Sequence, residues 1–393
     1  MRIGKPSLDM LALMTMSMAC DLTPFVMPLI VGALATQHGM SDASVGFIAT
    51  AQLMVCALLS FAMVPAVRNL NPRATVTLGL VLVALGNAFS LIGHNTPLLI
   101  TARLSAGFGE ALVNVVVGVL MAHKRDPDAG FAMINIGITA GAVVVFLISP
   151  MLSPHVGQDG IFWILAALPT LALPCVLGIP KGSLAMADNA ANIQRGRFLI
   201  SLPAIAILLG VVGFGIAGNA VFIFVERIGE SVGVSYNTLV KMLLWATAAT
   251  AAGPIVARVV GTRFGRIPVL AIAFLGLAIA CPMMGAPHSG TELFIGLNIG
   301  GFCLLFARPF YSGLMVAMDP AGRLITLSNG AIAIGRAITP SIASLMLLGG
   351  GGFPAMGDWS AVAAVVSFGL VYYAARSVRR LPAPVLAGAL QLE

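Results

Sequence analysis

Twelve apolar runs follow one another along this chain, each about as long as a helix that crosses a lipid bilayer. They cover residues 8–36, 44–65, 74–93, 97–121, 129–151, 160–180, 198–225, 236–258, 267–286, 292–317, 323–347 and 359–376. Only 9% of the residues are charged and the mean hydropathy is +1.01, whereas about a quarter of the residues in a soluble protein are charged. The chain is therefore predicted to be an all-α membrane protein whose main partner is the lipid bilayer.

The twelve runs divide into two similar groups of six. Short motifs recur at an offset of 194 residues, each in the equivalent link or run: Gly39-Met-Ser41 with Gly233-Val-Ser235, Asn135 with Asn329, and Gly141 with Gly335. Several matches at one offset indicate two duplicated, pseudo-symmetric halves. We expect the halves and their connections to occupy 1–180 (N-terminal half), 181–197 (cytoplasmic linker), 198–380 (C-terminal half) and 381–393 (cytoplasmic tail).

Basic residues predict the orientation of the chain in the membrane. Sixteen of the 21 lysines and arginines lie in the tails and links on the side of the N-terminus, and one, Arg227, lies in the links on the other side. By the positive-inside rule, this bias places both termini in the cytoplasm, with the protein in the cell's inner membrane. Because the excess charge of +7 is spread over short links, it does not indicate a nucleic-acid partner.

Prolines and glycines within the runs mark the places where we expect helices to break. Such breaks form substrate sites in secondary transporters. The expected positions are Pro24 and Pro28 in the first run, Gly210, Gly213, Gly215 and Gly218 in the seventh, and Pro309 in the tenth.

Three charged residues lie deep within the first half. Arg103 and Glu110 are seven residues apart in the fourth run, so their side chains lie on one side of a helix, and Asp21 lies near the middle of the first run. A charge at the bilayer centre costs about 2.5–3.5 kcal/mol, which indicates a polar cavity. We expect Asp21 and Glu110 to carry protons and an ion pair with Arg103 to tune Glu110. The alternative is a static Arg103–Glu110 bridge.

The second half carries bases within its runs, including Arg308 in the tenth run and Arg336 in the eleventh. Arginine offers a planar fork suited to carboxylate or phosphate, so these side chains predict an anionic substrate group. The alternative is that they bind backbone carbonyls at helix breaks. Further candidate substrate-binding residues are Tyr311, Asn114 and Asn219, although the two asparagines are equally suited to hydrogen-bonding between helices.

No cofactor other than the coupling proton is expected. The five cysteines show no metal-ligand spacing, and no Gly-x-x-x-x-Gly-Lys-Ser/Thr loop is present for a nucleotide. We therefore expect neither a metal site nor an enzymatic activity.

The chain resembles the major facilitator superfamily along nearly its whole length. The stretch Leu99-Ile-Thr-Ala-Arg103-Leu-Ser-Ala-Gly107-Phe-Gly109 is similar to the motif in that family's fourth helix, and Arg263-Phe-Gly265-Arg266 is similar to its cytoplasmic gating loop. Thr262, and Asn69 in the matching loop of the first half, stand where the family usually has aspartate. The set Asp21, Arg103 and Glu110 is similar to the proton-coupling residues of organic-anion symporters and Spinster-type transporters.

This resemblance implies a monomeric secondary active transporter whose two halves rock around a central cavity. We expect it to move a small organic solute, an anion, together with protons. The alternative is proton-linked efflux of drug-like or amphipathic compounds, although the fifth run offers Ser149-Pro150 in place of the glycine-proline motif of drug exporters. A non-transporting receptor on the same scaffold is a third possibility.

Overall fold

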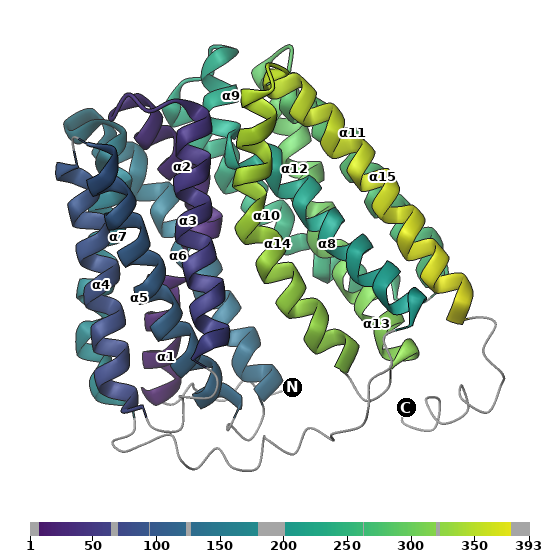
Figure 1. Ribbon diagram of the computed structural model, residues 1–393, viewed down its shortest axis with the longest axis horizontal. Helices are drawn as coiled ribbons and strands as arrows, with labels where there is room; N and C mark the ends of the chain where they lie inside the picture. The colour runs from purple at the N-terminus through teal and green to yellow at the C-terminus, as the bar shows by residue number, and fades with distance from the viewer. Residues whose placement is uncertain are drawn as a thin grey trace. The chain divides into compact units, whose positions relative to one another are not determined.

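The structure, a computed structural model, describes residues 8–63, 70–93, 95–122, 127–179, 201–261, 263–319 and 323–378. Within these ranges every regular element is a helix and no strand occurs, as Figure 1 shows. By length and composition, eleven stretches of the described chain can cross a membrane, and the longest of them, Gly130–Gly178 with 49 residues, is long enough to cross twice. Large apolar side chains such as Leu171, Trp245 and Ile272 are exposed on these helices, as lipid contact requires. The predicted all-helical membrane fold is confirmed.

The chain divides into two compact units, Met1–Arg195 and Gly196–Glu393. The first unit contains α1 (Leu8–Cys20), α2 (Thr23–Thr36), α3 (Asp42–Ala62), α4 (Pro72–Ile92), α5 (Thr96–Ala122), α6 (Pro127–Val156), α7 (Gly160–Ala172), and the 3₁₀ turns η2 (Gly157–Asp159) and η3 (Leu173–Gly178). The second contains α8 (Leu202–Ile223), α9 (Val225–Ser231), α10 (Tyr236–Val260), α11 (Arg266–Gly285), α12 (Gly290–Phe306), α13 (Arg308–Met318), α14 (Arg323–Leu348) and α15 (Gly352–Val378).

Helix α5 is the centre of packing in the first unit, between α4 on one side and α3 on the other. Glycines let the backbones meet: a methyl group on Gly109 would overlap the carbonyl oxygen of Gly79 in α4. A methyl group on Gly107 would likewise overlap the carbonyl oxygen of Gln52 in α3. Small residues at such contacts are the usual basis of close helix packing in membranes.

We expect Gly107→Ala to destabilise the protein by about 1–3 kcal/mol, because the added methyl group must push α3 away from α5. Gly118 on the same helix is the matched control, since nothing lies within 4 Å of a methyl group built there. Gly118→Ala should be neutral or stabilising by up to about 1 kcal/mol from helix propensity. Thermal denaturation of both purified variants checks this, and equal melting temperatures would contradict the close-contact interpretation.

In the second unit, α8 packs on α14 and α15, while α11 lies between α12 and α15, and α10 packs on α12. Equivalent parts of the two units repeat in detail. Gly39 and Gly233 both adopt positive φ, and the serine two residues after each caps the next helix through its side-chain oxygen. Gly141 on α6 packs against Met18 of α1, as Gly335 on α14 packs against Val212 of α8. The predicted pseudo-symmetry of the two halves is confirmed.

Two of the three expected helix breaks are present. The first run is divided at Asp21 and Leu22, between α1 and α2, and the tenth at Ala307, between α12 and α13. Each break lies directly before a proline in the first turn of the next helix, as expected for a residue that cannot donate to the preceding turn. Pro28 lies inside α2 without ending it.

The break expected at the glycines of the seventh run is wrong. Helix α8 runs through Gly210, Gly213, Gly215 and Gly218, and the run is interrupted only at Phe224. Three of these glycines serve close packing: methyl groups on Gly210 and Gly213 would meet Ser367 of α15, and one on Gly218 would meet Leu304 of α12, whereas nothing lies within 4 Å of a methyl group on Gly215.

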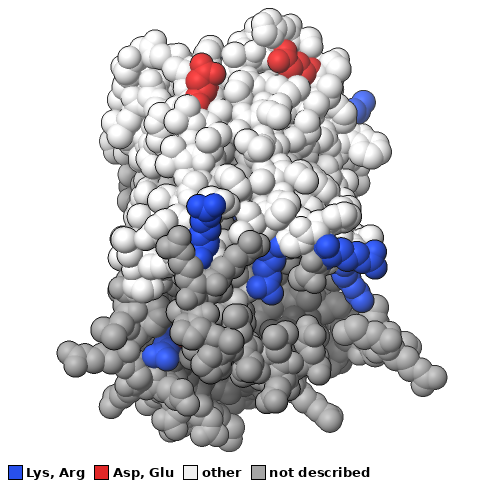
Figure 2. Space-filling view, turned by 90° about the vertical axis from the view of Figure 1, so that its right-hand side faces the viewer, with Lys and Arg blue, Asp and Glu red and all other residues white. Residues whose placement is uncertain are grey.

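Charged residues on the face shown in Figure 2 are separated by sign. Most of the Lys and Arg side chains lie toward the lower end, Asp and Glu lie near the upper end, and a broad uncharged belt separates them. Such a belt matches the hydrocarbon layer of a bilayer. The orientation with both termini in the cytoplasm depends on this same asymmetry and stays a prediction.

Candidate functional site

The break in the first run places Asp21 between two helix ends. Pro24 has no N–H, so the hydrogen-bond ladder of α1 ends with Asp21 N donating to Ser17 O at 2.8 Å, and α2 starts at Thr23. Asp21 is partly buried, and its carboxyl is hydrogen-bonded by Asn114 of α5. The break therefore directs an acid and a hydroxyl, those of Asp21 and Thr23, toward α5.

Glu110 lies on α5 one helical turn before Asn114 and is only 4% exposed. Its Oε1 accepts a hydrogen bond from Thr23 Oγ1 at 2.6 Å and another from Gln52 Nε2 at 2.8 Å. Helices α2, α3 and α5 thus meet at one carboxyl group. Asp21 lies close enough to Glu110 for the two carboxyls to interact electrostatically. The structure brings Asp21, Glu110 and Asn114 together.

Two residues of this cluster were missed by the sequence analysis, Thr23 and Gln52. Both are uncharged, so neither stands out in an apolar run as a charge does. A signal was nevertheless present for Gln52, an amide in the middle of the second run, because burying such a group is costly unless it is hydrogen-bonded.

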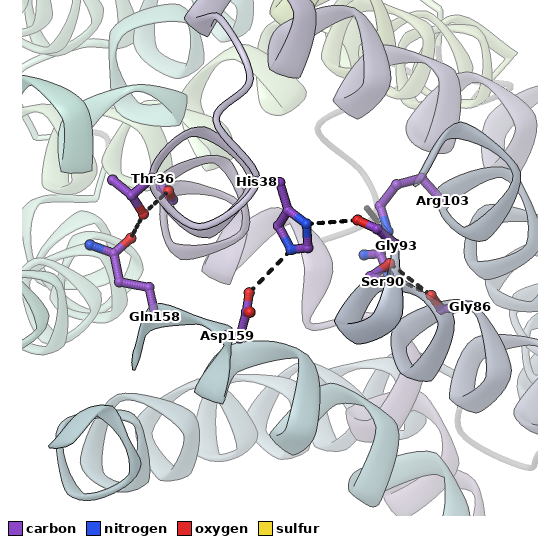
Figure 3. Close-up of polar contacts among 9 residues, drawn as sticks. Thr36, His38, Gly86, Ser90, Gly93, Arg103, Gln158 and Asp159 are labelled. Carbon is purple, nitrogen blue, oxygen red and sulfur yellow. Dashed lines mark hydrogen bonds and ion pairs between the residues drawn. The ribbon is translucent and has the colours of Figure 1, made fainter. Parts of the chain in front are cut away.

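Arg103 does not form the expected ion pair. Its Nη2 donates to Gly86 O at 3.0 Å, Asn87 Oδ1 at 2.9 Å and Ser90 Oγ at 2.8 Å, all on α4. Figure 3 shows the side chain pointing toward Gly86 and Ser90.

The Arg103 guanidinium also lies 5.0 Å from the centre of the Phe162 ring of α7. Among the described residues, no ion pair joins Arg103 to Glu110, which hydrogen-bonds to α2 and α3 instead. The physical reason is that three acceptors on α4 bind Nη2 of Arg103 and an aromatic face on α7 lies against its guanidinium, although its Nε and Nη1 are buried without a hydrogen-bond partner. Arg103 then acts on Glu110 only through a longer-range electrostatic interaction, and its role in tuning Glu110 stays a prediction.

A second polar cluster, at the ends of α2, α4 and α6, was not found from the sequence. His38, just beyond α2, has its Nδ1 2.8 Å from Gly93 O and its Nε2 3.3 Å from Asp159 Oδ1 (Figure 3). Thr36 Oγ1 donates to Gln158 Oε1 at 2.6 Å beside it. Since a carbonyl and a carboxylate are both acceptors, the imidazolium form, with two N–H donors, suits both contacts.

The Asp159 carboxylate raises the pKa of His38, with burial of the ring acting in the opposite direction. A raised pKa in the folded state means that protonation stabilises the fold. The contribution is complete below the unfolded-state value near about 6.5 and is lost as pH rises through the folded-state pKa.

His38→Gln should therefore lower the melting temperature more at about pH 5 than at about pH 8, the range over which histidine changes charge. His155→Gln is the control, because it removes another histidine, one in the last turn of α6. A difference between parent and His38→Gln that stays constant or grows with pH would contradict the assignment.

In the second unit, Arg308 and Arg336 come together with Tyr311. Arg308 is the first residue of α13 after the break at Ala307, Tyr311 lies one turn further, and Arg336 projects from α14. The three side chains interact electrostatically, and both arginines are exposed whereas Tyr311 is 7% exposed. Within the described part of the chain, no carboxylate lies within ion-pair distance of either arginine. Two cations that face each other without a counter-charge favour an anion.

The side-chain amide of Asn219 forms a hydrogen bond within its own helix, α8. Its Nδ2 donates to Gly215 O, one turn back in α8, at 2.7 Å. That bond uses one of the two N–H groups of the amide, and the Asn114 amide nitrogen likewise lies 4.0 Å from Cys56 Sγ, so the substrate-binding roles of both asparagines stay predictions.

The loop between α10 and α11 contains two of the glycines with positive φ, Gly261 at +54° and Gly265 at +76°. Gly265 directly precedes α11, and the guanidinium of Arg266 lies against Gly313 of α13, within 3.3 Å of where a methyl group would stand. Arg263 is exposed. The gating role predicted for Arg263, Gly265 and Arg266 stays a prediction, and both Thr262 and Asn69 lie outside the described residues.

These features define a class: a multi-pass helical membrane protein of two repeated units, with helices broken beside buried or paired charges. The family model described as Major Facilitator Superfamily matches residues 10–340. The chain belongs to this superfamily of transporters, and the predicted membership is confirmed. No curated protein matches it in sequence.

Solved structures have the same fold at low sequence identity. A D-xylose–proton symporter is 15% identical with a TM-score of 0.68, covering 90% of this chain and 96% of its own. The nucleoside transporter NupG is 14% identical with a TM-score of 0.70, covering 96% and 100%. The peptide transporter POT in complex with alafosfalin is 14% identical with a TM-score of 0.69, covering 93% and 95%.

Proposed function

We propose that this transporter moves a small organic anion together with protons, as a monomer in the cell's inner membrane with both termini in the cytoplasm. The observation that carries the anion proposal is the pair Arg308 and Arg336: two exposed arginines on different helices, close enough to repel, with no carboxylate partner among the described residues. An anionic group that accepts from both guanidinium forks would relieve that repulsion.

Proton coupling is assigned to the first unit. Glu110 is buried and Asp21 lies at a helix break beside it, so each can gain or lose a proton within the membrane span. The similarity in fold to a protein named as a D-xylose–proton symporter supports this assignment.

The test is transport by the purified full chain in liposomes with an imposed pH gradient. We expect a labelled organic anion from a panel of monocarboxylates, dicarboxylates and phosphate esters to accumulate on the alkaline side and not without the gradient. A membrane potential of 100 mV adds about 2.3 kcal/mol for each net charge moved. Accumulation of neutral solutes alone would overturn the anion proposal, and accumulation independent of both gradients would overturn coupling.

The alternative, proton-linked efflux of amphipathic compounds, uses the same carboxyls but opposes the two fluxes. Vesicles distinguish the two mechanisms by direction. Under the same gradient, an exporter would drive an amphipathic dye such as ethidium toward the acidic side, whereas a symporter drives its solute with the protons.

A further inference from the structure

The amide of Gln52 is only half satisfied. Gln52 is 1% exposed, and its Nε2 donates to Glu110 Oε1 at 2.8 Å and lies 3.4 Å from Thr23 Oγ1. Its Oε1 is buried and has no hydrogen-bond partner. Buried amide oxygens are almost always hydrogen-bonded, so this one requires an explanation.

The chemistry of Glu110 supplies one. An ionised carboxylate only accepts hydrogen bonds, and here it accepts two, from Thr23 and Gln52. A protonated carboxyl must also donate through its O–H. The acceptor that it needs is the second end of the same Gln52 amide, which a half-turn about the last side-chain bond would bring into place.

We propose that Gln52 is a positioning residue that follows the protonation state of Glu110. Its amide nitrogen donates to the ionised carboxylate, and its amide oxygen accepts from the protonated carboxyl. The inference rests on the proton-coupling role that the proposed function gives to Glu110, and it adds the group that transmits the change.

The local packing explains why protonation of Glu110 would turn the amide group and would not move the helix. The carbonyl of Gln52 lies against Gly107, one turn before Glu110, at a separation that leaves no room for a methyl group. The backbones of α3 and α5 are therefore fixed at this point, so a change in hydrogen bonding must be taken up by the side-chain amide. Thr23, the first residue of α2, shares Glu110 Oε1, so the reversal alters hydrogen bonds to α2, α3 and α5 together.

Four other ionisable groups surround Glu110: the Asp21 carboxyl between α1 and α2, the Arg103 guanidinium on α5, and the thiols of Cys20 on α1 and Cys56 on α3. Each interacts with Glu110 electrostatically. Both Thr23 and Gln52 carry a donor and an acceptor, but the oxygen of Thr23 already lies 3.4 Å from Gln52 Nε2, whereas the amide oxygen of Gln52 has no partner and is the acceptor available to a protonated carboxyl.

The test is a pH titration of the full chain in lipid vesicles, followed by difference infrared spectroscopy. The protonated carboxyl band of Glu110 is assigned by its loss in Glu110→Gln. In Gln52→Met, the band should shift to higher frequency because the O–H has lost its acceptor. Its pH midpoint should also rise, on the order of tenfold in proton affinity, because a charge-assisted bond to the ionised form is stronger than a neutral one.

Gln52→Leu repeats the measurement in case the methionine variant folds poorly. Thr50→Val on the same helix is the control, because the Thr50 hydroxyl has no hydrogen-bond partner. The Glu110 carboxyl band of this variant should match that of the parent. An unshifted band in both Gln52 variants, or a Glu110 carboxyl that never protonates across the titration, would overturn the inference. A shifted band in a protein without proton-driven flux would overturn the proposed function alone.

Discussion

Arg336→Ala is expected to weaken binding of the transported anion by about 10- to 150-fold, and Arg308→Ala by a similar factor. Each arginine supplies charged hydrogen bonds, which contribute about 1.5–3 kcal/mol apiece. The side chain of Arg336 is exposed and lies beside Arg308, so its loss removes half of a paired positive site and leaves the helix backbone in place. The measurement is the shift in melting temperature of the purified protein against the concentration of the anion identified in vesicles.

Two variants sharpen this result. Arg336→Lys keeps the charge but loses the planar fork, so its affinity should fall between those of parent and alanine variant if bidentate contacts matter. Lys241→Ala removes an exposed basic residue of α10 and should bind as the parent does. If Arg308→Ala and Arg336→Ala both bind the anion as tightly as the parent, the two arginines do not hold it.

What the sequence predicted correctly has a local physical cause. The positions of the membrane-crossing stretches follow from the length of apolar runs, and the breaks before Pro24 and Pro309 follow from the missing N–H of proline. The proximity of Asp21 to Glu110 was expected because an ion deep in a membrane needs polar neighbours, and the fold provides them within one unit.

What the sequence left undetermined depends on contacts between distant segments. The direction of Arg103 is set by Ser90 and Asn87 on α4 and by Phe162 on α7, none of which its own helix reveals. The glycines of α8 are compatible with close packing and with a helix break, and contacts with neighbouring helices determine which of the two occurs. The contact of His38 with Asp159 joins two loops that no periodicity connects.

Glu110→Gln is expected to abolish proton-driven accumulation of the anion while leaving exchange of labelled for unlabelled anion intact. Glutamine keeps the shape of the side chain and an oxygen that can accept from Thr23, but it cannot gain or lose a proton. Exchange needs no net proton movement, whereas accumulation does. When one proton moves with one monoanion no net charge crosses, so the pH gradient supplies the drive: one pH unit provides about 1.4 kcal/mol, which corresponds to about tenfold accumulation, and this factor should fall to about one.

Glu292→Gln is the matched control, because Glu292 lies in the first turn of α12, in the second unit, and is hydrogen-bonded to His288, whereas the α2–α3–α5 cluster belongs to the first unit. It should accumulate the anion as the parent does. If Glu110→Gln accumulates and exchanges normally, the proton moves through another group, and Asp21→Asn becomes the variant to measure. If Glu110→Gln loses exchange as well as accumulation, Glu110 acts in substrate binding, because a residue needed only for coupling is not required when no net proton crosses.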